Sequence, residues 1–430
     1  MKVYLDTIGC RLNQSEIDTL ARQLVANGHE ITTDPAVADQ IVINTCAVTN
    51  QAARDARKMT RRLHRQNEAA TITLTGCYAT IAPDQITVLP GNPTVVPNHA
   101  KNNLIHHLDP AAQDLPVFDL EPIMRDTHGQ TGRSRAFIKA QDGCNNRCTF
   151  CITTVARGDS LSRPLGDIVA EIQTLSQAGY QEAVLTGVHL GSYGRDLSAQ
   201  SDLKALTHAI LTYTDIPRLR LSSLEPWDIP DNFFSLWDNP RLLPHLHLPL
   251  QAGCDATLRR MARRTTQANF RAIVDDARAH IPHLNLTTDI IVGFPGETDD
   301  DFATSLNYVA DIAFNGLHVF SYSPRPGTAA ATMPNHVAKA VKKARTQQMI
   351  TLGHQLTQQY LTQHHGQTRP VLWESVLQAD DNGLLWAGYT DNYLRVNAYG
   401  PATLGNTVTP TTLAPHPDDS TMLFGQVGTP

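Results

Sequence analysis

One short segment with three cysteines constrains this chain more than any other feature of its sequence. Residues 143–151 read GCNNRCTFC and follow the strand-like run AFIKAQ, so Cys144, Cys148 and Cys151 have the spacing C-x3-C-x2-C. Three thiolates on one tight loop can hold three irons of a cubane cluster and leave the fourth iron without a protein ligand. That open iron can bind a small chelating cofactor, whereas an electron carrier normally fills the position with a fourth cysteine.

Zinc is the structural alternative for this loop. Three cysteines together with a histidine or a distant fourth cysteine also satisfy tetrahedral zinc. Zinc sites are usually built from pairs of ligands, however, and neither a second pair nor a suitably spaced histidine occurs near the loop. We therefore favour an iron–sulfur cluster over zinc.

Three further cysteines each follow a strand-like run near the start of the chain. The runs KVYLDTIG, QIVINT and TITLTG come just before Cys10, Cys46 and Cys77, and helical segments such as SEIDTLARQLVANG separate them. This βαβαβ alternation predicts a parallel sheet, in which strand ends meet at one edge. A single free cysteine is commonly a core residue. Three at equivalent strand ends instead favour a second three-ligand cluster, provided that these strands are neighbours.

The remaining sequence predicts two further domains of an α/β protein. Six strand-like runs alternate with helical segments from about residue 136, which is too few for a closed eight-unit barrel and indicates a partial (β/α)6 barrel. A long helix is expected over 338–365, and the short β runs after it indicate a small all-β domain. The predicted domains are residues 1–125, 130–365 and 366–430.

Composition limits the location and the role of the cysteines. The chain is 41% apolar and 18% charged, which is typical of an ordered globular protein. Its first residues do not resemble a signal peptide, and no stretch approaches twenty apolar residues. We therefore expect a cytoplasmic protein without membrane contact. Thiols stay reduced there, so the seven cysteines are not expected to form disulfides. Cys254 has no partner at ligand spacing and is expected to pack in the core.

RNA binding would have to use local patches, because the net charge of −6 gives no overall attraction to nucleic acid. The best candidate is a basic helical segment whose cations share one side, with a merely solvated helix face as the alternative: Arg54, Arg57, Lys58, Arg61 and Arg65. Further candidates are a second basic group and the C-terminal aromatics, for which core packing is the alternative: Arg259, Arg260, Arg263, Arg264, Trp373, Trp386, Tyr389 and Tyr393.

The motifs of the chain resemble a known enzyme family. The three-cysteine loop, with Phe150 in the aromatic position before the last cysteine, resembles the radical S-adenosylmethionine (SAM) superfamily. The wider set resembles the methylthiotransferases over nearly the whole chain, and within them the branch that acts on N6-threonylcarbamoyladenosine in tRNA. These motifs are TIGCRLNQSE, NTCAVTNQAARDARK, TGCYA, GCNNRCTFCITTVARG, TGVHLGSYG, LSSLEP, LPLQAGCD and DIIVGFPGET.

The resemblance implies a fold, cofactors and partners. It implies an N-terminal domain with an auxiliary 4Fe-4S cluster, a central radical SAM barrel with a second 4Fe-4S cluster that binds SAM, and a C-terminal domain of the TRAM type. It implies transfer of a methylthio group to C2 of the modified adenosine at position 37, next to the anticodon. The partners would be tRNA, an electron donor and a sulfur source, with the protein acting as a monomer.

The resemblance assigns roles to the cysteines and to several other residues. Cys10, Cys46 and Cys77 would hold the auxiliary cluster, and Cys144, Cys148 and Cys151 the SAM-binding cluster. Candidates for SAM contact, each with an ordinary core or barrel-rim role as its alternative, are Phe150, Gly187, Glu225, Gln251, Ile291 and Val292. Arg157 is interpreted by default as a surface arginine, with a carboxylate or phosphate as its alternative partner.

Three other functions stay open at this point. The enzyme could modify another tRNA adenosine or a ribosomal protein, or the chain could be a non-catalytic iron–sulfur or zinc protein that binds RNA. Absence of SAM cleavage, with RNA bound equally well by a Cys144→Ala variant, would favour the non-catalytic interpretation.

Overall fold

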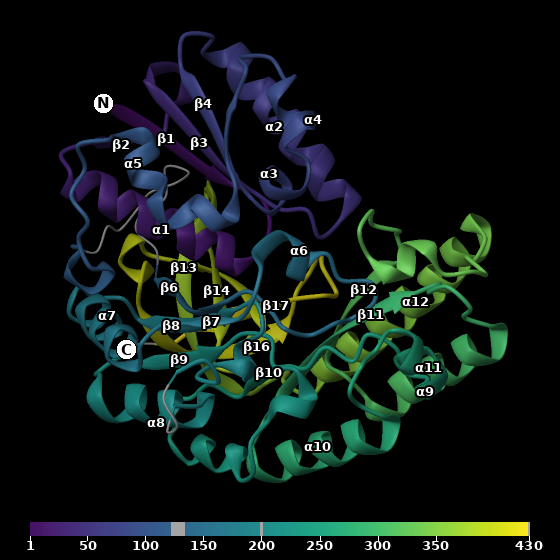
Figure 1. The fold of residues 1–430 in the computed structure, drawn as a ribbon. Helices are drawn as coiled ribbons and strands as arrows, with labels where there is room; N and C mark the ends of the chain where they lie inside the picture. Colours follow the sequence, from purple (N-terminus) through teal and green to yellow (C-terminus); the bar gives the residue numbers. More distant parts are fainter. Residues whose placement is uncertain (122–133, 198–200, 429–430) are drawn as a thin grey trace.

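The structure, a computed structural model, describes residues 1–121, 134–197 and 201–428. Three β structures follow one another along the chain: an N-terminal parallel sheet, a partial barrel and a closed C-terminal barrel (Figure 1). This architecture confirms the predicted α/β class with a small all-β unit at the end. In the described part of the chain, no helix is both long and apolar enough to cross a membrane.

The N-terminal sheet has five parallel strands in the order β2-β1-β3-β4-β5. Their bounds are Lys2–Thr7 (β1), Glu30–Thr32 (β2), Gln40–Thr45 (β3), Thr71–Gly76 (β4) and Thr94–Val96 (β5). The predicted strands β1, β3 and β4 are direct neighbours, with Leu5 opposite Val42 and Ile43 opposite Leu74. The edge strands β2 and β5 are additional to the prediction, because runs of three residues carry too little periodicity to recognise.

Helices cover both faces of this sheet, as strands buried on both sides require. One face packs on α1 and α5, and the other on α2 and α3. The bounds of the helices are Arg11–Ala26 (α1), Asn50–Gln66 (α2), Cys77–Ile81 (α3), Pro83–Thr87 (α4) and Leu104–Leu108 (α5). Helix α1 begins directly after Cys10, earlier than the segment SEIDTLARQLVANG predicts.

The partial barrel has the six predicted parallel strands. Their bounds are Arg135–Asp142 (β6), Glu182–Gly187 (β8), Arg218–Leu221 (β9), His245–His247 (β10), Asn285–Val292 (β11) and Gly316–Ser321 (β12). They form the groups β6-β8-β9 and β10-β11-β12, which the parallel bridge between Ser223 and His247 connects. The short strand β7 (Leu161–Ser162) runs antiparallel to β6.

The longer helices of this part lie on the outside of the strands, whereas the short α6 lies toward the N-terminal part (Figure 1). Their bounds are Thr153–Arg157 (α6), Leu165–Gln177 (α7), Leu203–Tyr213 (α8), Asp255–Arg260 (α9), Gln267–His280 (α10), Asp299–Ile312 (α11) and Lys339–Thr362 (α12). The predicted long helix is therefore α12. One large apolar core joins α7, α8, α10, α11 and α12 to the strands.

The C-terminal barrel closes in the order β13-β14-β15-β17-β16. Its strands are Thr368–Asp380 (β13), Gly383–Thr390 (β14), Arg395–Gly400 (β15), Val408–Pro415 (β16) and Leu423–Val427 (β17). Trp373 and Trp386 lie in its core, 0% and 2% exposed, so these two aromatics pack in the core and are not available to stack on RNA bases.

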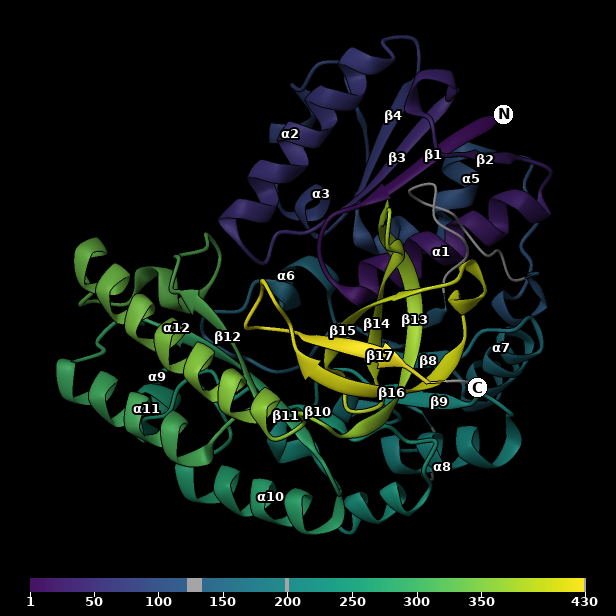
Figure 2. The same ribbon diagram turned by 180° about the vertical axis from the view of Figure 1, so that it is seen from behind.

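The C-terminal barrel packs on the end of the partial barrel where the strands start (Figure 2). Arg135, the first residue of β6, donates from Nη2 to Glu374 Oε2 over 2.9 Å, and Arg218, the first of β9, donates to the carbonyl of Thr390. Tyr393 also reaches the N-terminal part of the chain, because its hydroxyl accepts from Arg11 Nη2 over 2.6 Å. At the opposite end of the partial barrel, residues that follow the strands line a cavity together with Val48–Asn50 of the N-terminal part.

Candidate functional site

The three-cysteine loop lies at the carboxyl end of β6, the end of a barrel strand where functional groups are expected. Gly143 starts the loop with φ +66°, and a Cβ at this position would lie 1.8 Å from the carbonyl oxygen of Asp159. The amide of Cys144 then donates to the carbonyl of Gly158 over 3.0 Å. The loop is therefore held so tightly against its own return segment that only glycine fits before the first cysteine.

Hydrogen-bond donors point at the sulfur atoms of this loop. The amides of Asn146 and Thr153 each lie 3.4 Å from a sulfur, those of Cys144 and Cys151 respectively. The third sulfur, of Cys148, accepts from Arg263 Nη1 over 3.8 Å. Burial raises the pKa of Cys148 to about 11 in spite of the Arg263 charge, so this thiol is protonated at neutral pH and metal binding would release its proton. The chemistry of this donor set suits a 4Fe-4S cluster.

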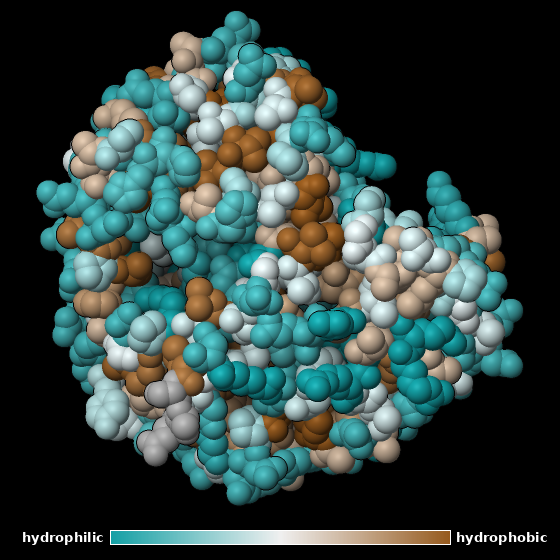
Figure 3. All heavy atoms as spheres, viewed as in Figure 1, coloured by the Kyte–Doolittle hydropathy of each residue, from teal (hydrophilic) through white to brown (hydrophobic). Residues whose placement is uncertain are grey.

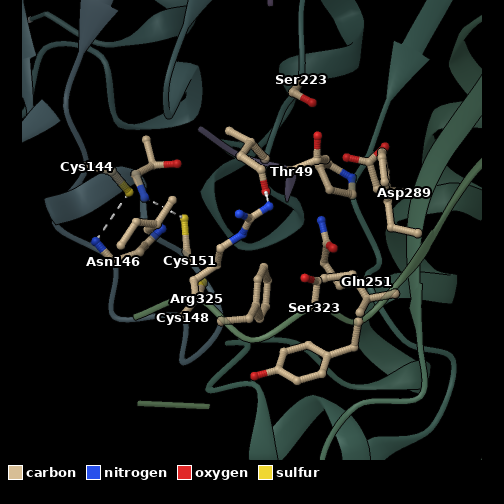
Figure 4. A pocket seen from close by; sticks show the side chains of 18 of the residues that line it. Thr49, Cys144, Asn146, Cys148, Cys151, Ser223, Gln251, Asp289, Ser323 and Arg325 are labelled. Carbon is tan, nitrogen blue, oxygen red and sulfur yellow. Dashed lines mark hydrogen bonds between the residues drawn. The ribbon is translucent and has the colours of Figure 1, made fainter. Parts of the chain in front are cut away.

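A cavity of about 570 Å³ opens beside the three cysteines. Figure 4 shows the three cysteines on one side, Gln251 and Asp289 on the other, and Arg325 between them. The face drawn in Figure 3 is notched between the N-terminal part and the lobe that carries α9, α11 and α12. This volume is large enough for a ligand of the size of SAM.

Most of the predicted SAM-contact residues line this cavity: Phe150, Glu225, Gln251 and Ile291. Val292 does not, because successive side chains of a strand point to opposite faces, and Val292 is 1% exposed in the barrel core. Gly187 is not a lining residue either; its neighbour Val188 is. A Cβ on Gly187 would lie 3.1 Å from the Gln141 side chain, so this glycine serves the packing of the strand end.

His189 is a residue of the site that the sequence does not single out. It lines the cavity and pairs with the buried carboxylate of Asp228, which Arg195 also contacts. Burial disfavours the charged imidazole, but hydrogen bonds to Asp228 and Cys144 raise the pKa of His189 to about 9. The position of His189 in the segment TGVHLGSYG, just after β8, is the only sequence signal that could have indicated it.

Arg263 also belongs to this site and not to an RNA-binding surface, so its assignment as an RNA candidate is wrong. Its side chain is 1% exposed and contacts Glu225 Oε2 over 2.6 Å. Its guanidinium lies 4.3 Å from the ring centroid of Trp227. Arg263 therefore connects the Cys148 sulfur to the cavity wall at Glu225.

The three N-terminal cysteines lie at one edge of the N-terminal sheet, as the strand order requires. Cys10 precedes α1, Cys46 follows β3 and Cys77 begins α3. A Cβ on Gly9, at φ +129°, would lie 2.5 Å from Cys46 Cβ, so the chain passes close to Cys46 just before it reaches Cys10. The amide of Val48 donates to the sulfur of Cys46, and Asn98 Nδ2 lies 3.7 Å from that of Cys77. Three thiols at one sheet edge fit a second cubane better than separate core positions.

Neither group of thiols is arranged around a single ion. Within residues 1–121, 134–197 and 201–428, no three His, Cys, Asp or Glu side chains are placed to hold one metal ion. A cubane has a different geometric requirement, because each thiolate binds a different iron.

The N-terminal sheet contributes a wall of the cavity through the loop that follows Cys46. Val48, Thr49 and Asn50 line the cavity. Arg325, in the loop after β12, donates to Asn50 Oδ1 over 2.5 Å and to the carbonyl of Val48 over 3.0 Å. The cavity is therefore lined on one side by the three-cysteine loop and on another by the loop that follows Cys46.

Arg157 is buried between the same two parts, so its interpretation as a surface arginine is wrong. Its side chain is 3% exposed and pairs with Glu16 of α1 over 2.9 Å and with Asp142 of β6 over 2.8 Å. The carboxylate alternative is the one that the structure bears out.

The predicted basic helix is α2, and its cations differ in exposure. The exposed ones are Arg54, Lys58, Arg61, Arg62 and Arg65. Arg57 is partly buried: its Nη1 donates to the Tyr78 hydroxyl over 2.8 Å and its guanidinium lies over the Tyr78 ring. Arg57 therefore has an internal role, whereas the other four predicted cations of α2 face solvent.

Comparisons with known proteins agree with this architecture. Residues 2–96 match the Uncharacterized protein family UPF0004, and residues 138–309 match the Radical SAM superfamily. The chain is 36% identical over 403 residues to the threonylcarbamoyladenosine tRNA methylthiotransferase MtaB of Bacillus subtilis, which covers 92% of this chain and 89% of that protein. The protein of the same name from Thermotoga maritima is 36% identical over 399 residues, covering 91% of this chain and 90% of that protein.

A related activity is found at slightly lower identity. The tRNA-2-methylthio-N(6)-dimethylallyladenosine synthase of Thermoanaerobacter sp. is 32% identical over 401 residues, covering 89% of this chain and 84% of that protein. Among solved structures, the radical SAM methyltransferase TsrM of Kitasatospora setae has a TM-score of 0.58 at 14% identity, covering 77% of each chain. That likeness concerns the fold alone.

Proposed function

The chain belongs to the radical SAM tRNA methylthiotransferases, and from this membership we propose that it adds a methylthio group to C2 of N6-threonylcarbamoyladenosine at position 37 of tRNA. The two relatives with 36% identity are named for threonylcarbamoyladenosine, whereas the relative named for dimethylallyladenosine is 32% identical. As a member of the superfamily, the chain uses a 4Fe-4S cluster and SAM.

One observation carries the proposal. The cavity beside Cys144, Cys148 and Cys151 is closed on another side by Val48–Asn50, the loop that follows Cys46. A substrate base in this cavity would face the SAM-binding loop and the loop of the second cysteine group at once. The reaction needs both, because a C–H bond must be broken and a sulfur atom inserted at the same carbon.

The chemistry at C2 explains why a radical cofactor is needed. No side-chain base readily ionises the C2–H bond of an adenine, and the SAM-bound cluster supplies a 5′-deoxyadenosyl radical that can abstract its hydrogen. The protein groups then have binding roles. Phe150 and Ile291 offer apolar contact to the cofactor, and Glu225 and Gln251 offer hydrogen bonds at the cavity wall. His189 and Asn146 face the cavity from beside Cys144.

We further propose that Cys10, Cys46 and Cys77 hold an auxiliary 4Fe-4S cluster that supplies the sulfur, while a second SAM supplies the methyl group. The support is their placement at one sheet edge together with hydrogen-bond donors directed at the sulfurs of Cys46 and Cys77. A separate protein or small molecule must restore the sulfur, and a one-electron donor must reduce the SAM-binding cluster.

For tRNA, we propose that the exposed cations of α2 contact phosphates, since such contacts need only accessible positive charge. α2 begins at Asn50, which lines the cavity, so RNA held along this helix would be close to the reaction site. We place the reaction in the cytoplasm, where tRNA is found and free thiols stay reduced, and we expect the monomer to be sufficient.

The test is the modification itself. Cells lacking the gene should lose the methylthio group from threonylcarbamoyladenosine alone, measured by mass spectrometry of tRNA nucleosides and of ribosomal proteins. Complementation with the wild-type gene should restore it, and a Cys144→Ala gene should not. Loss from dimethylallyladenosine or from a ribosomal protein would replace the proposed substrate, and unchanged nucleosides and proteins would exclude the proposed activity.

A further inference from the structure

Arg157 is close in sequence to the three-cysteine loop, but its side chain lies near the N-terminal cysteines. It is the last residue of α6, the helix that begins two residues after Cys151. Its Nη2 donates to Asn13 Oδ1 over 2.7 Å, and that same oxygen lies 3.7 Å from the sulfur of Cys10. The carbonyl of the preceding residue, Ala156, accepts from Asn98 Nδ2, which also approaches the sulfur of Cys77.

The charges around Arg157 do not cancel. Lys101 contacts Glu16 over 2.6 Å, and Lys139 contacts Glu16 and Asp142 over 3.5 and 3.3 Å. Burial acts to raise the pKa of Glu16, but Lys101, Arg157 and Lys139 hold it well below its usual range, so this carboxylate is ionised. Three cations therefore surround two carboxylates, and the cluster of side chains has one positive charge in excess.

A cubane held by Cys10, Cys46 and Cys77 has the complementary charge. The oxidised core carries two positive charges and three thiolates carry three negative ones, which leaves a single negative charge. The excess positive charge and the cluster would neutralise each other.

We propose that Arg157 is a positioning residue for the auxiliary cluster, whose positive charge balances the cluster and raises its reduction potential. The inference rests on the proposal that Cys10, Cys46 and Cys77 hold a 4Fe-4S cluster. One-electron reduction adds a negative charge to that cluster, and a nearby cation in a poorly solvated site stabilises the reduced form more than the oxidised form.

A purely structural role for Arg157 is the alternative, because the residue also joins α1 to the partial barrel. The chain contains a matched control for that role. Arg22, further along α1, pairs with Glu171 of α7 over 3.0 Å, and the two side chains are 6% and 5% exposed. Its other partners are the carbonyls of Val117, Leu120 and Glu121, and none of these contacts is a cysteine.

The test is a redox titration of the auxiliary cluster alone. Full-length protein with Cys144, Cys148 and Cys151 changed to Ala is reconstituted and titrated by electron paramagnetic resonance. Arg157→Gln should make the midpoint potential more negative by about 59 mV or more. For one electron, this shift is a tenfold change in the equilibrium constant for reduction. Arg157→Lys should keep most of the potential, and Arg22→Gln should leave it unchanged. An Arg157→Gln cluster with the parent potential would overturn the inference.

Glu16→Gln keeps the test decisive if Arg157→Gln does not retain iron. Removing this carboxylate should shift the potential in the positive direction, whereas damage to the packing has no reason to reverse the sign. A negative shift or none would reject the electrostatic role. If the parent triple variant itself binds no cluster while Cys10, Cys46 and Cys77 are intact, the proposal of an auxiliary cluster fails instead, so the two failures are distinguishable.

Discussion

Arg325 and Asn50 meet at the cavity, where the guanidinium of one donates to the side-chain oxygen of the other over 2.5 Å. Asn50 in turn donates to Ser323 Oγ over 2.5 Å, so the loop after β12 and the start of α2 are joined twice. This junction fixes the wall formed by the N-terminal sheet relative to the barrel strands. Substrate positioning should therefore depend on it more than SAM binding does.

Arg325→Ala should separate the two halves of the reaction. Loss of a charge-assisted hydrogen bond at a partly buried site costs about 1.5–3 kcal/mol, so methylthio transfer should fall about tenfold or more while SAM cleavage without tRNA persists. The ratio of methylthiolated nucleoside to 5′-deoxyadenosine measures this effect. Arg271→Ala, which removes an exposed pair with Asp311, is the control and should leave the ratio unchanged. Equal loss of both products in Arg325→Ala would contradict the prediction.

Single substitutions of Cys10, Cys46 or Cys77 by Ser should remove one cluster only. Reconstituted wild-type protein is expected to hold about eight irons per chain, because each cubane has four, and each variant about four. SAM cleavage should continue in these variants and methylthio transfer should stop. Cys254→Ser is the control, since this buried thiol donates to Asp301 and belongs to neither cysteine group. A wild-type protein that holds only about four irons per chain would disprove the prediction of a second cluster.

Glu182→Gln should destabilise the partial barrel strongly. Glu182 is 0% exposed and accepts from Arg218 over 2.9 Å and from Arg220 over 2.8 Å. Removing one partner leaves uncompensated buried arginines, and such changes cost about 3–5 kcal/mol of the free energy of unfolding. Urea unfolding followed by circular dichroism measures the change. Breaking the exposed Arg271–Asp311 pair should cost less than about 1 kcal/mol by the same measurement.

The pKa of Glu182 should also make the free energy of unfolding depend on pH. Burial acts to raise the pKa of Glu182, but Arg220 and Arg218 lower it to about 2. Because this folded-state pKa is below the unfolded value of about 4.3, the stabilisation is fully present above about pH 5 and is lost as the pH falls toward 2. Wild-type protein should therefore lose its stability advantage over Glu182→Gln progressively between about pH 5 and about pH 2. Parallel curves for the two proteins would disprove the shift.

Substitutions on α2 should weaken tRNA binding in a salt-dependent way. Changing Lys58, Arg61 and Arg65 together to Ala should reduce affinity and lower the slope of log K against log salt by about 1 for each of these cations that binds a phosphate. Filter binding at several salt concentrations measures the slope. Lys204→Ala on α8 is the control. An unchanged slope in the triple variant would place the RNA elsewhere.

The sequence predicted the parts of the site that depend on short spacing or on strand order. Cys144, Cys148 and Cys151 lie within one loop, and the convergence of Cys10, Cys46 and Cys77 follows from three parallel strands being neighbours. The different positions of Ile291 and Val292 could also have been predicted. Both residues lie in one predicted strand, and adjacent residues of a strand face opposite sides.

The contacts between the parts of the chain were beyond such reasoning. Arg157 and Glu16 are 141 positions apart, and their pairing depends on how α1 docks against β6. Arg263 looked like part of a basic surface because four arginines lie close together in the sequence, yet Glu225 and Trp227 draw it into the barrel. Neither contact has a periodic or local pattern, so only the packed structure reveals it.

The bond between Arg11 and Tyr393 bears on when the auxiliary site becomes complete. Arg11 follows Cys10, whereas Tyr393 lies 382 positions later, in the C-terminal barrel. During synthesis, the surroundings of the first cysteine are therefore incomplete until the C-terminal barrel has been made. We expect cluster insertion at Cys10, Cys46 and Cys77 to follow the synthesis of the C-terminal barrel, so nascent chains that lack this barrel should not retain this iron.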